Sequence, residues 1–311
     1  MSTLKKLQPD LYKARRKSFL RKYGLALLFS APFLISFVTF FVYPFFKGIV
    51  MSLFRWNIAD PTDTAWRGFE NYNKILFDSS SLYFNEFWTS LGRTMLAVLI
   101  LVPLCVVLPF ILAVLIEKRP YCKKLFQAII YLPGIFPLSA TGVIFLNLFN
   151  YEYGFVNNVF HLNTNWLQNP TTAWALIILF CVWGGLGSNF IILSAAIKDV
   201  DKTLYEASAI DGCSRFKQAF YITLPSIRRQ ITLCLFTTMC GYMGLYGQNY
   251  ILGAYALPHD SVETVIFKIQ NFLQGTPFEA YGMISAMAIC LGLFTAIVSG
   301  LQMLITRERK G

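Results

Sequence analysis

Side chains that could carry out covalent chemistry are scarce in this sequence of 311 residues. Its two histidines, His161 and His259, lie outside the long hydrophobic stretches, and neither belongs to an H-E-x-x-H zinc-protease motif. Catalysis by a serine and a histidine would need a histidine within those stretches, and the sequence has none there. The sequence also lacks G-x-x-x-x-G-K-[ST], the loop that cradles the phosphates of ATP. We therefore expect no catalytic residue, no metal site and no cofactor bound by this chain.

A polar passage over residues 205–225 stands out between two hydrophobic stretches, and it reads Y-E-A-S-A-I-D-G-C-S-R-F-K-Q-A-F-Y-I-T-L-P. The spacing of Thr203 and Glu206 predicts a capping box, with Thr203 at the N-cap of a short helix over 205–210. Gly212 can adopt the left-handed conformation that ends such a helix.

A second short helix is predicted over 215–221, with Ser214 as its N-cap. Pro225 is expected to limit this helix, because the residue before a proline, here Leu224, disfavours the helical region. Two interpretations of the passage remain open: a loop that packs on its own protein, or a docking element. The residues that would meet a docking partner are small or acidic: Glu206, Ala207, Ser208, Ala209 and Asp211.

The elements that must hold this passage are hydrophobic helices. The chain is 56% hydrophobic and only 14% charged, whereas soluble domains carry about a quarter charged residues. Six stretches without Asp, Glu, Lys or Arg approach or exceed the roughly 20 residues that cross a bilayer: 23–46, 95–116, 126–149, 171–197, 230–253 and 280–306. Since backbone groups in lipid must bond internally, we predict an all-α membrane protein with six transmembrane helices.

The basic residues indicate the topology. Most of the 27 Lys and Arg residues lie before the first stretch, between the second and third, between the fourth and fifth, or after the sixth. The positive-inside rule makes that side cytoplasmic and places both termini there. The net charge of +11 is then explained by membrane topology, so we expect contact with membrane lipid and no nucleic-acid partner. The seven cysteines contain no C-x-x-C motif, and no disulfide framework is expected.

One hydrophobic stretch contains two prolines and a glycine in close succession, at Leu132-Pro133-Gly134-Ile135-Phe136-Pro137. Because proline removes a helical hydrogen bond and bends the axis, this segment is predicted to be kinked or locally unwound. Packing geometry and a role in gating both remain open as reasons for it.

The polar passage resembles a known signature. Glu206-Ala207-Ser208, then Gly212, then nine residues, then Ile222-Thr223-Leu224-Pro225 is similar to the E-A-A—G—I-x-L-P signature of bacterial ABC importer permeases. Ser208 departs from it, since alanine is usual there. The resemblance implies that this loop forms coupling helices which sit in a cleft of a cytosolic ATPase. The implied ATPase-coupling residues are Glu206, Ala207, Ser208, Ala209, Gly212, Ile222, Leu224 and Pro225.

Two further segments resemble carbohydrate-importer permeases of the maltose and sn-glycerol-3-phosphate type. Arg67-Gly68-Phe69-Glu70-Asn71-Tyr72 is similar to their F-x-G-L-x-N-Y segment, and Tyr131-Leu132-Pro133 is similar to their third-span segment. The chain departs from them at Tyr246-Gly247, where Phe-Asp is frequent, and at Ala256-Leu257-Pro258, where Gly-Gly-Pro is frequent. These departures bear on which solute is carried and not on the class of protein.

The resemblance implies the type I ABC importer permease fold, with both termini cytoplasmic, in the bacterial plasma membrane. It implies a permease subunit of an ATP-driven, binding-protein-dependent importer of a sugar or oligosaccharide. The implied partners are a second permease in a heterodimer, two cytosolic ABC ATPases that hold ATP and Mg, and an external solute-binding protein. The expected parts are a basic tail (1–22), a first transmembrane helix (23–47), an extracytoplasmic loop (48–90), a core domain (91–306) with coupling loop 198–229, and a tail (307–311).

A sugar path needs hydrogen-bonding groups and aromatic faces, which the fourth and fifth stretches supply. The candidate path residues are Trp183, Gly185, Asn189, Thr238, Tyr242, Tyr246, Gln248 and Asn249. Contact between neighbouring helices explains the glycine and Asn189 equally well.

Three alternatives remain. The chain could be a permease for another solute, such as an amino acid, a glycerophosphodiester or an organic cation. It could be a membrane enzyme, which would need buried nucleophiles, bases or metal ligands that the sequence lacks. It could be a structural or sensory membrane protein, which would not need the spaced coupling signature.

Overall fold

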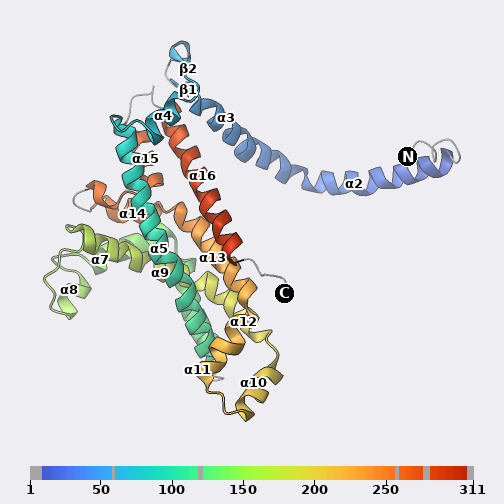
Figure 1. The fold of residues 1–311 in the computed structure, drawn as a ribbon, viewed down its shortest axis with the longest axis vertical. Coiled ribbons are helices and arrows are strands. Elements are labelled where there is room, and N and C mark those ends of the chain that lie inside the picture. Colours follow the sequence, from blue (N-terminus) through green and yellow to red (C-terminus); the bar gives the residue numbers. More distant parts are fainter. Residues whose placement is uncertain (1–8, 58–59, 118–121, 256–258, 276–280, 307–311) are drawn as a thin grey trace. The chain divides into compact units, whose positions relative to one another are not determined.

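The computed structural model describes residues 9–57, 60–117, 122–255, 259–275 and 281–306, and most of them are helical (Figure 1). The chain divides into two compact units. The first comprises Met1–Asn71 and Phe278–Ala286, and the second comprises Tyr72–Pro277 and Met287–Gly311. The tail over 307–311 and the Ala256-Leu257-Pro258 departure lie outside the described residues.

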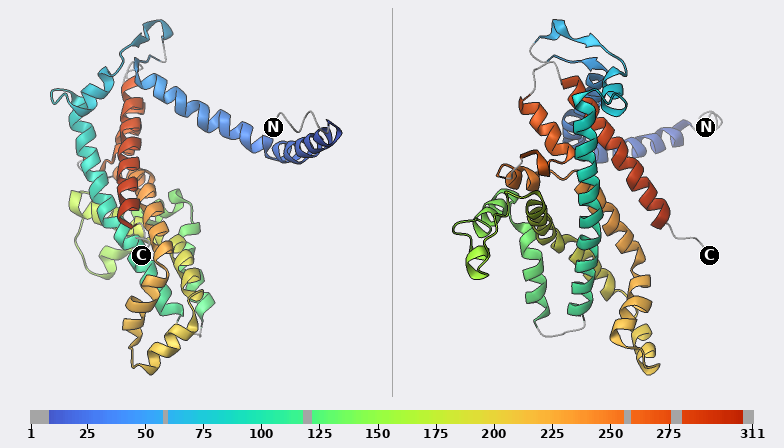
Figure 2. Two further views of the ribbon diagram at one scale, coloured as in Figure 1. Left: turned by 45° about the vertical axis from the view of Figure 1, so that its right-hand side comes forward. Right: turned by 60° about the vertical axis from the view of Figure 1, so that its left-hand side comes forward.

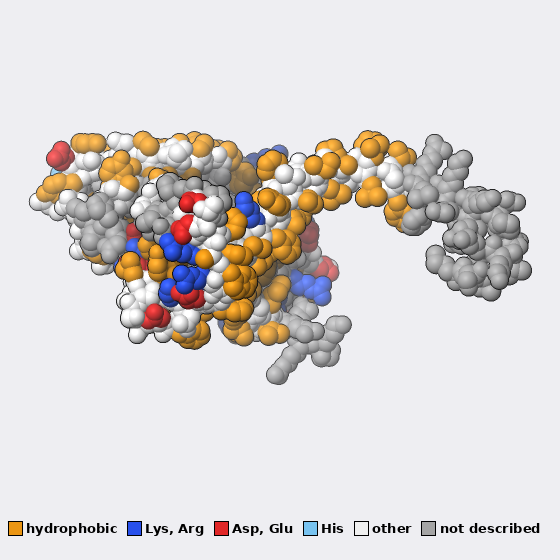
Figure 3. All heavy atoms as spheres, turned by 90° about the horizontal axis from the view of Figure 1, so that it is seen from above, with side chains coloured by type: hydrophobic (Ala, Val, Ile, Leu, Met, Phe, Trp, Pro, Cys, Tyr) orange, Lys and Arg blue, Asp and Glu red, His pale blue; other side chains and the backbone are white. Residues whose placement is uncertain are grey.

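The first unit begins with a helical rod made of α2 (Pro9–Phe37), η1 (Val38–Val42) and α3 (Tyr43–Ser52). Residues 23–52 of this rod are long and apolar enough to cross a membrane, so the predicted first helix is present and ends later than residue 47. Helix α2 already begins within the predicted basic tail. Hydrophobic side chains are exposed along residues 23–52 of the rod (Figure 3), and Phe29 and Phe40 are 83% and 80% exposed. This surface suits lipid or another protein rather than water.

The predicted extracytoplasmic loop is folded rather than irregular. It contains β1 (Phe54–Arg55), η2 (Pro61–Asp63), β2 (Ala65–Trp66) and α4 (Glu70–Leu76), and β1 pairs antiparallel with β2. The Asn71 side-chain amide donates to the carbonyl oxygens of Ser52 at 2.8 Å and Phe54 at 3.0 Å. Asn71 therefore fastens the start of α4 to the end of α3 and to the first strand.

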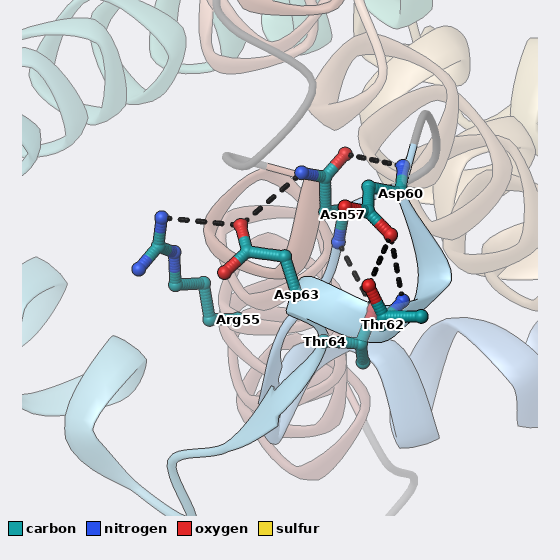
Figure 4. A network of polar contacts seen from close by, with 6 residues as sticks. All are labelled: Arg55, Asn57, Asp60, Thr62, Asp63 and Thr64. Atoms are coloured by element: carbon teal, nitrogen blue, oxygen red, sulfur yellow. Dashed lines mark hydrogen bonds and ion pairs between the residues drawn. The ribbon is translucent and has the colours of Figure 1, made fainter.

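The turn between the two strands is held by a network of polar side chains (Figure 4). The Asp63 carboxylate accepts from Arg55 at 3.3 Å and from the Asn57 amide at 3.2 Å. Asp60 accepts from both the backbone and the hydroxyl of Thr62, at 2.9 and 2.6 Å. Such local side-chain bonds stabilise a turn without a hydrophobic core.

The second unit is built around α5 (Leu82–Glu117) and α9 (Pro170–Lys198), which make the most extensive contact between elements of this unit. Helix α13 (Arg228–Met243) packs against both (Figure 2). Helix α9 starts with Asn169, whose side chain accepts from the backbone amide of Thr171 at 2.9 Å. Pro170 at its first position fits, because the amide hydrogen that proline lacks has no helical partner there.

The third hydrophobic stretch is broken as the prolines predict. It consists of α6 (Lys123–Tyr131), η3 (Leu132–Ile135) and α7 (Leu138–Leu148), and the axis bends by 98° at the break. Phe136 is extended, with ψ 137°, and so is Pro137, with ψ 138°. This conformation follows from Pro137, which disfavours a helical Phe136.

The predicted count of six spanning helices is not confirmed. Four described helices are long and apolar enough to cross a membrane, or five if α6–η3 and α7 form one bent span. The fifth predicted stretch is divided in two, because α13 ends at Met243 and α14 (Gly247–Gly253) begins only after Tyr246, whose φ and ψ are −142° and −59°. Two glycines, Gly244 and Gly247, flank this division, and glycine weakens a helix by about 1 kcal/mol relative to alanine.

Apart from the short helices between α9 and α13, which are described below, the other elements are α8 (Phe155–Val159), η5 (His259–Val262), α15 (Val265–Gly275) and α16 (Tyr281–Thr306). Helix α16 supplies residues to both units. An ion network joins α15 to α5: Lys268 Nζ lies 2.7 Å from Glu86 and 2.6 Å from Glu263. Burial by itself lowers the pKa of Lys268, but the hydrogen bonds and charges of Glu263 and Glu86 outweigh it and raise this pKa.

The described core of the second unit includes two separate hydrophobic clusters. One includes Leu101, Phe145 and Phe180, and the other includes Phe110, Phe190 and Leu193. Both clusters draw on α5 and α9, so the gap between them falls at one level of these two helices. The polar residues of a cavity, described below, occupy that level.

Candidate functional site

The predicted coupling loop begins with α10 (Lys202–Ile210). The predicted capping box is wrong, because Asp201 and not Thr203 is the N-cap: its carboxylate accepts from the Thr203 backbone amide at 2.9 Å. Aspartate caps helices well, and its position adds a turn before residue 205. The hydrogen bonds from the Thr203 backbone and hydroxyl lower the pKa of Asp201. Glu206 is therefore not needed for the cap and stands exposed on α10.

Gly212 ends α10 as predicted. Its φ is +75°, which glycine adopts at no steric cost. The Cys213 amide donates to the Ser208 carbonyl at 2.9 Å, and the Gly212 amide donates to the Ala209 carbonyl at 3.1 Å. This pair of bonds is a Schellman motif, so the turn direction is set by backbone geometry.

Ser214 caps the next helix as predicted, accepting from the Lys217 amide at 3.4 Å. The helical path then runs through α11 (Arg215–Gln218), η4 (Ala219–Thr223) and α12 (Leu224–Ser226). The predicted limit at Pro225 is wrong, because Leu224 is helical, with φ −59° and ψ −46°.

The five residues before Leu224 explain why this proline is tolerated. They form a π-helical turn in which the Leu224 amide bonds to the Ala219 carbonyl. A π turn is wider than an α turn, and it makes room for a ring that would otherwise meet the preceding carbonyl. The rod of the first unit shows the same pairing, since η1 directly precedes Tyr43 and Pro44.

Side-chain bonds inside the loop join its two helices. Gln218 Nε2 donates to the Ser208 hydroxyl at 3.0 Å and to the Tyr205 carbonyl at 3.2 Å. The Tyr205 and Thr223 hydroxyls are 2.8 Å apart. Ser208, the departure from the signature, is thus the acceptor for Gln218, and alanine could not accept. The loop is held as one unit from α10 to η4.

The predicted coupling residues divide between two faces of this loop. Glu206, Ala207, Ala209, Gly212 and Pro225 are exposed, while Ser208, Ile222 and Leu224 are half-buried. Leu224 packs against the cluster that contains Phe190. Large apolar side chains also face outward from the loop, since Ile210 is 87% exposed and Phe216 is 73% exposed. The outward face therefore has the apolar character of a protein contact.

A cavity of about 730 Å³ lies at the level between the two hydrophobic clusters. Six of the eight predicted path residues line it: Gly185, Asn189, Thr238, Tyr242, Tyr246 and Gln248. The division of α13 from α14 contributes to its wall, because Gly244, Leu245 and Gly247 line it as well. None of the described residues that line this central cavity is Asp, Glu, Lys, Arg or His.

The polar groups of the central cavity are mostly bonded to neighbouring helices. Asn189 Nδ2 donates to the Cys105 carbonyl at 2.7 Å and to the Thr238 hydroxyl at 2.9 Å. The Tyr242 hydroxyl donates to the Cys181 carbonyl at 3.0 Å. These bonds link α5, α9 and α13, and they satisfy groups that would be costly to leave unpaired inside a membrane protein. A Cβ atom at Gly185 would lie 2.7 Å from the Tyr242 hydroxyl, so a larger residue here would have to displace that side chain.

Two predicted path residues do not line the central cavity. The Trp183 ring packs with Phe145, with centroids 5.9 Å apart. Asn249 is fully buried and donates to the Val262 carbonyl at 2.6 Å. Both residues support the fold around the cavity rather than its surface.

The structure adds residues that the sequence analysis did not select, among them Cys105, Ser188, Ile192 and Thr237. Helical spacing could have found two of them, because Ser188 and Ile192 follow Gly185 at three and seven residues and so share its helix face. Cys105 carries no such signal, since it comes from α5. In the described part of the chain no group of His, Cys, Asp and Glu could hold a metal ion.

A family model described as "Binding-protein-dependent transport system inner membrane component" matches residues 75–311, which is more than half of the chain. Among curated proteins, the chain is 26% identical over 302 residues to the arabinooligosaccharides transport system permease protein AraP of Bacillus subtilis (strain 168), covering 95% of this chain and 93% of that protein. It is 28% identical over 306 residues to the lactose transport system permease protein LacF of Rhizobium radiobacter, covering 95% and 98%.

Two solved structures share the fold. One is a crystal structure of a bacterial ABC transporter involved in the import of the acidic polysaccharide alginate, with 21% identity and a TM-score of 0.78, covering 96% of this chain and 100% of that chain. The other is the bacterial alginate ABC transporter in complex with an alginate pentasaccharide-bound periplasmic protein, with 21% identity and a TM-score of 0.73, covering 93% and 94%. At this identity the likeness concerns the fold alone.

Proposed function

Because this chain belongs to the family of binding-protein-dependent transport system inner membrane components, we propose that it forms half of the translocation path of an ATP-driven sugar importer. It is a multi-pass membrane subunit for transport and not an enzyme, as family membership implies. A second permease subunit completes the path, and an external binding protein delivers the solute. Two cytosolic ATPases, with ATP and Mg, drive the cycle.

The observation that carries the proposal is the coupling loop. Its two short helices are tied together by the Ser208–Gln218 and Tyr205–Thr223 bonds, while Ile210 and Phe216 point outward. A rigid element with an apolar outer face can transmit the movement of a bound ATPase to the core. Leu224 supplies the inner connection, because it packs on the cluster around Phe190.

The solute is a neutral sugar or oligosaccharide. The central cavity offers hydroxyl, amide and aromatic groups from Thr238, Tyr246 and Gln248 and, among its described residues, no Asp, Glu, Lys, Arg or His. An amino acid, a phosphodiester or an acidic saccharide brings a charge that would need a partner at this depth. The relatives named for arabinooligosaccharides and lactose support the same class.

The coupling loop faces the cytosol. Basic residues gather there and before the first span, as the positive-inside rule requires. With both termini on this side, the strand pair over 54–66 faces the external binding protein.

The test is a steric block on the outer face of α10. Ala207 is exposed, so Ala207→Trp leaves the fold intact but fills the expected ATPase cleft. We expect co-purification of the ATPases and vanadate-sensitive uptake of a neutral oligosaccharide in vesicles to be lost together. Ala254→Trp, at an equally exposed alanine outside the loop, serves as the matched control. Normal assembly and uptake in the Ala207 variant would show that the loop is not the coupling element.

A further inference from the structure

A second cavity, of about 570 Å³, lies at the end of the second unit that carries the coupling loop. Four basic residues line it, Lys123, Lys198, Lys202 and Arg215, together with one acidic residue, Glu117. Lys198 and Glu117 stand at the ends of α9 and α5, whereas Lys202 and Arg215 belong to α10 and α11. This basic pocket therefore brings charges of the core helices and charges of the coupling loop to one place.

Glu117, the one carboxylate among the described lining residues of the basic pocket, already has partners. Glu117 forms an ion pair with Lys123, lies 3.7 Å from Lys198 Nζ, and accepts from the Ser194 hydroxyl at 2.9 Å. One carboxylate can neutralise only one of the three lysines that line the pocket. An excess of positive charge therefore remains among the lysines that line the pocket, and this excess favours binding of an anion.

The wall between the charges offers neutral polar groups. Tyr205, Gln218 and Thr223 line the same pocket, and their bonds hold α10 against the segment that leads back to α13. These neutral groups are bonded to one another and fix the shape of the wall, so the cations are the donors for an anion with several oxygens. Lysine supplies point charges to such an anion, and arginine supplies a planar fork of donors.

We propose that the basic pocket binds a phosphate group, which is either the headgroup of an anionic phospholipid or a soluble phosphate. The bound phosphate bridges the lysines at the ends of the core helices and the cations of the coupling loop. It thereby links the loop to the core. Occupancy of the pocket sets how firmly movement of the loop is passed to the central cavity.

A neighbouring groove favours the phospholipid as the source. This groove, of about 330 Å³, lies between α6 and α9 and shares Lys198 with the basic pocket. Its other lining includes Tyr131, Phe190, Ile191 and Ala195, which are mostly apolar. A headgroup at Lys198 could thus have an acyl chain beside it. Basic pockets near the cytoplasmic ends of membrane helices commonly bind anionic headgroups.

The experiment compares two double variants of the whole transporter. The first double variant removes two cations of the basic pocket and combines Lys198→Gln with Lys202→Gln. In Lys124→Gln with Lys217→Gln, the same charge is removed from exposed lysines that do not line the pocket. Each complex is placed in nanodiscs of phosphatidylcholine, and its thermal unfolding is followed while phosphatidylglycerol content or inorganic phosphate is raised.

Ligand binding to the folded state raises the unfolding midpoint. We expect the wild type and the Lys124/Lys217 control to respond equally, and the Lys198/Lys202 variant to need roughly 30-fold more ligand, since each lysine near an anionic headgroup contributes about 1 kcal/mol. A response to phosphatidylglycerol identifies the lipid as the source, and a response to phosphate alone identifies a soluble ligand.

The proposal is overturned if neither probe stabilises the wild type, or if the Lys198/Lys202 variant responds like the control. Should that variant fail to assemble, Lys202→Gln alone carries the comparison against Lys217→Gln. Lys202 is exposed and forms no ion pair with the described residues, so its replacement does not threaten the fold.

Discussion

The central cavity and the basic pocket lie in the same helical unit but differ in charge. The central cavity is lined by hydroxyl, amide, thiol and aromatic groups, with no ionisable side chain other than cysteine and tyrosine among its described residues. The basic pocket has four cations and one carboxylate. The first suits a neutral solute, and the second suits an anion.

Depth in the membrane explains the difference. A charged side chain near the bilayer centre costs about 2.5 to 3.5 kcal/mol on insertion scales, so the middle of the helices tolerates only groups that neighbours can satisfy, as Cys105 and Thr238 do for Asn189. At the helix ends, lysine and arginine reach water and anionic headgroups. Selection of the solute and control of coupling can therefore use separate chemistry.

The largest effect is expected from a charge placed in the central cavity. Ser188 lines it and is exposed there, so Ser188→Lys introduces an unpaired cation without disturbing the core. We expect uptake of a neutral oligosaccharide to fall about 100-fold, measured in vesicles with the assembled transporter. Ser188→Gln is the matched control, with similar length and no charge. Equal uptake by both variants would mean that the solute does not pass this cavity.

A smaller effect is expected from Asn189→Leu, which keeps the volume but removes both donated hydrogen bonds. The Cys105 carbonyl and the Thr238 hydroxyl then lose a partner within the protein. The expected loss of stability is about 2 kcal/mol, measured as a lower denaturation midpoint of the complex. Gln248→Leu, at a half-buried position on the cavity wall, should cost less. Unchanged stability of the Asn189 variant would show that this polar level does not hold the helices together.

In the basic pocket, Glu117→Gln removes the only carboxylate among its described lining residues. Lys123 and Lys198 lose their ion pairs, and stability should fall by about 1 to 2 kcal/mol because the pocket is partly shielded from water. The same change raises the positive charge of the pocket, so phosphate or phosphatidylglycerol should restore part of the loss. A matched control is Glu206→Gln on the exposed face of α10. Failure of both anions to restore stability would count against the phosphate site.

The smallest effect is expected from Ser208→Ala, which restores the usual residue of the signature. Gln218 then loses one acceptor at 3.0 Å, and the loss of a hydrogen bond costs about 1 kcal/mol. Transport should continue, with weaker coupling seen as more ATP hydrolysed for each solute imported. Ser226→Ala, which removes an exposed serine hydroxyl that bonds to the Ile222 carbonyl and not to Gln218, should leave this ratio unchanged. An unaltered ratio in the Ser208 variant would show that the bond between Ser208 and Gln218 plays no part in coupling.

Some features of the loop could be predicted from local sequence because they depend on neighbouring residues only. Gly212 takes a positive φ and Ser214 caps a helix, since both choices are made within one turn of backbone. The predicted capping box is wrong because the Asp201 carboxylate, rather than that of Glu206, accepts from the Thr203 backbone amide. Pro225 does not end the helix, because a π turn widens the helix before it. No local sequence rule predicts this π turn.

The central cavity could be predicted only in part. Six candidates in two hydrophobic stretches were identified because polar groups are rare there, but the same rarity also selected Trp183 and Asn249, which pack elsewhere. Cys105 was missed because its role depends on a helix that lies far away in sequence. Whether a polar group faces a cavity or a neighbouring helix depends on how its helix is rotated about its own axis. A stretch that is hydrophobic on all sides does not determine this rotation.

The sequence by itself determined that this chain is a helical membrane protein with a spaced coupling signature, because hydrophobic length, charge distribution and turn residues act locally. Only the tertiary structure decided which helices are continuous, which polar groups bond to each other, and where charges from distant segments meet. Lys198 and Arg215 share a pocket with Glu117 because α5 and α9 pack side by side and the loop folds back beneath them. That packing results from the summed fit of many side chains, and no single segment of the sequence encodes it.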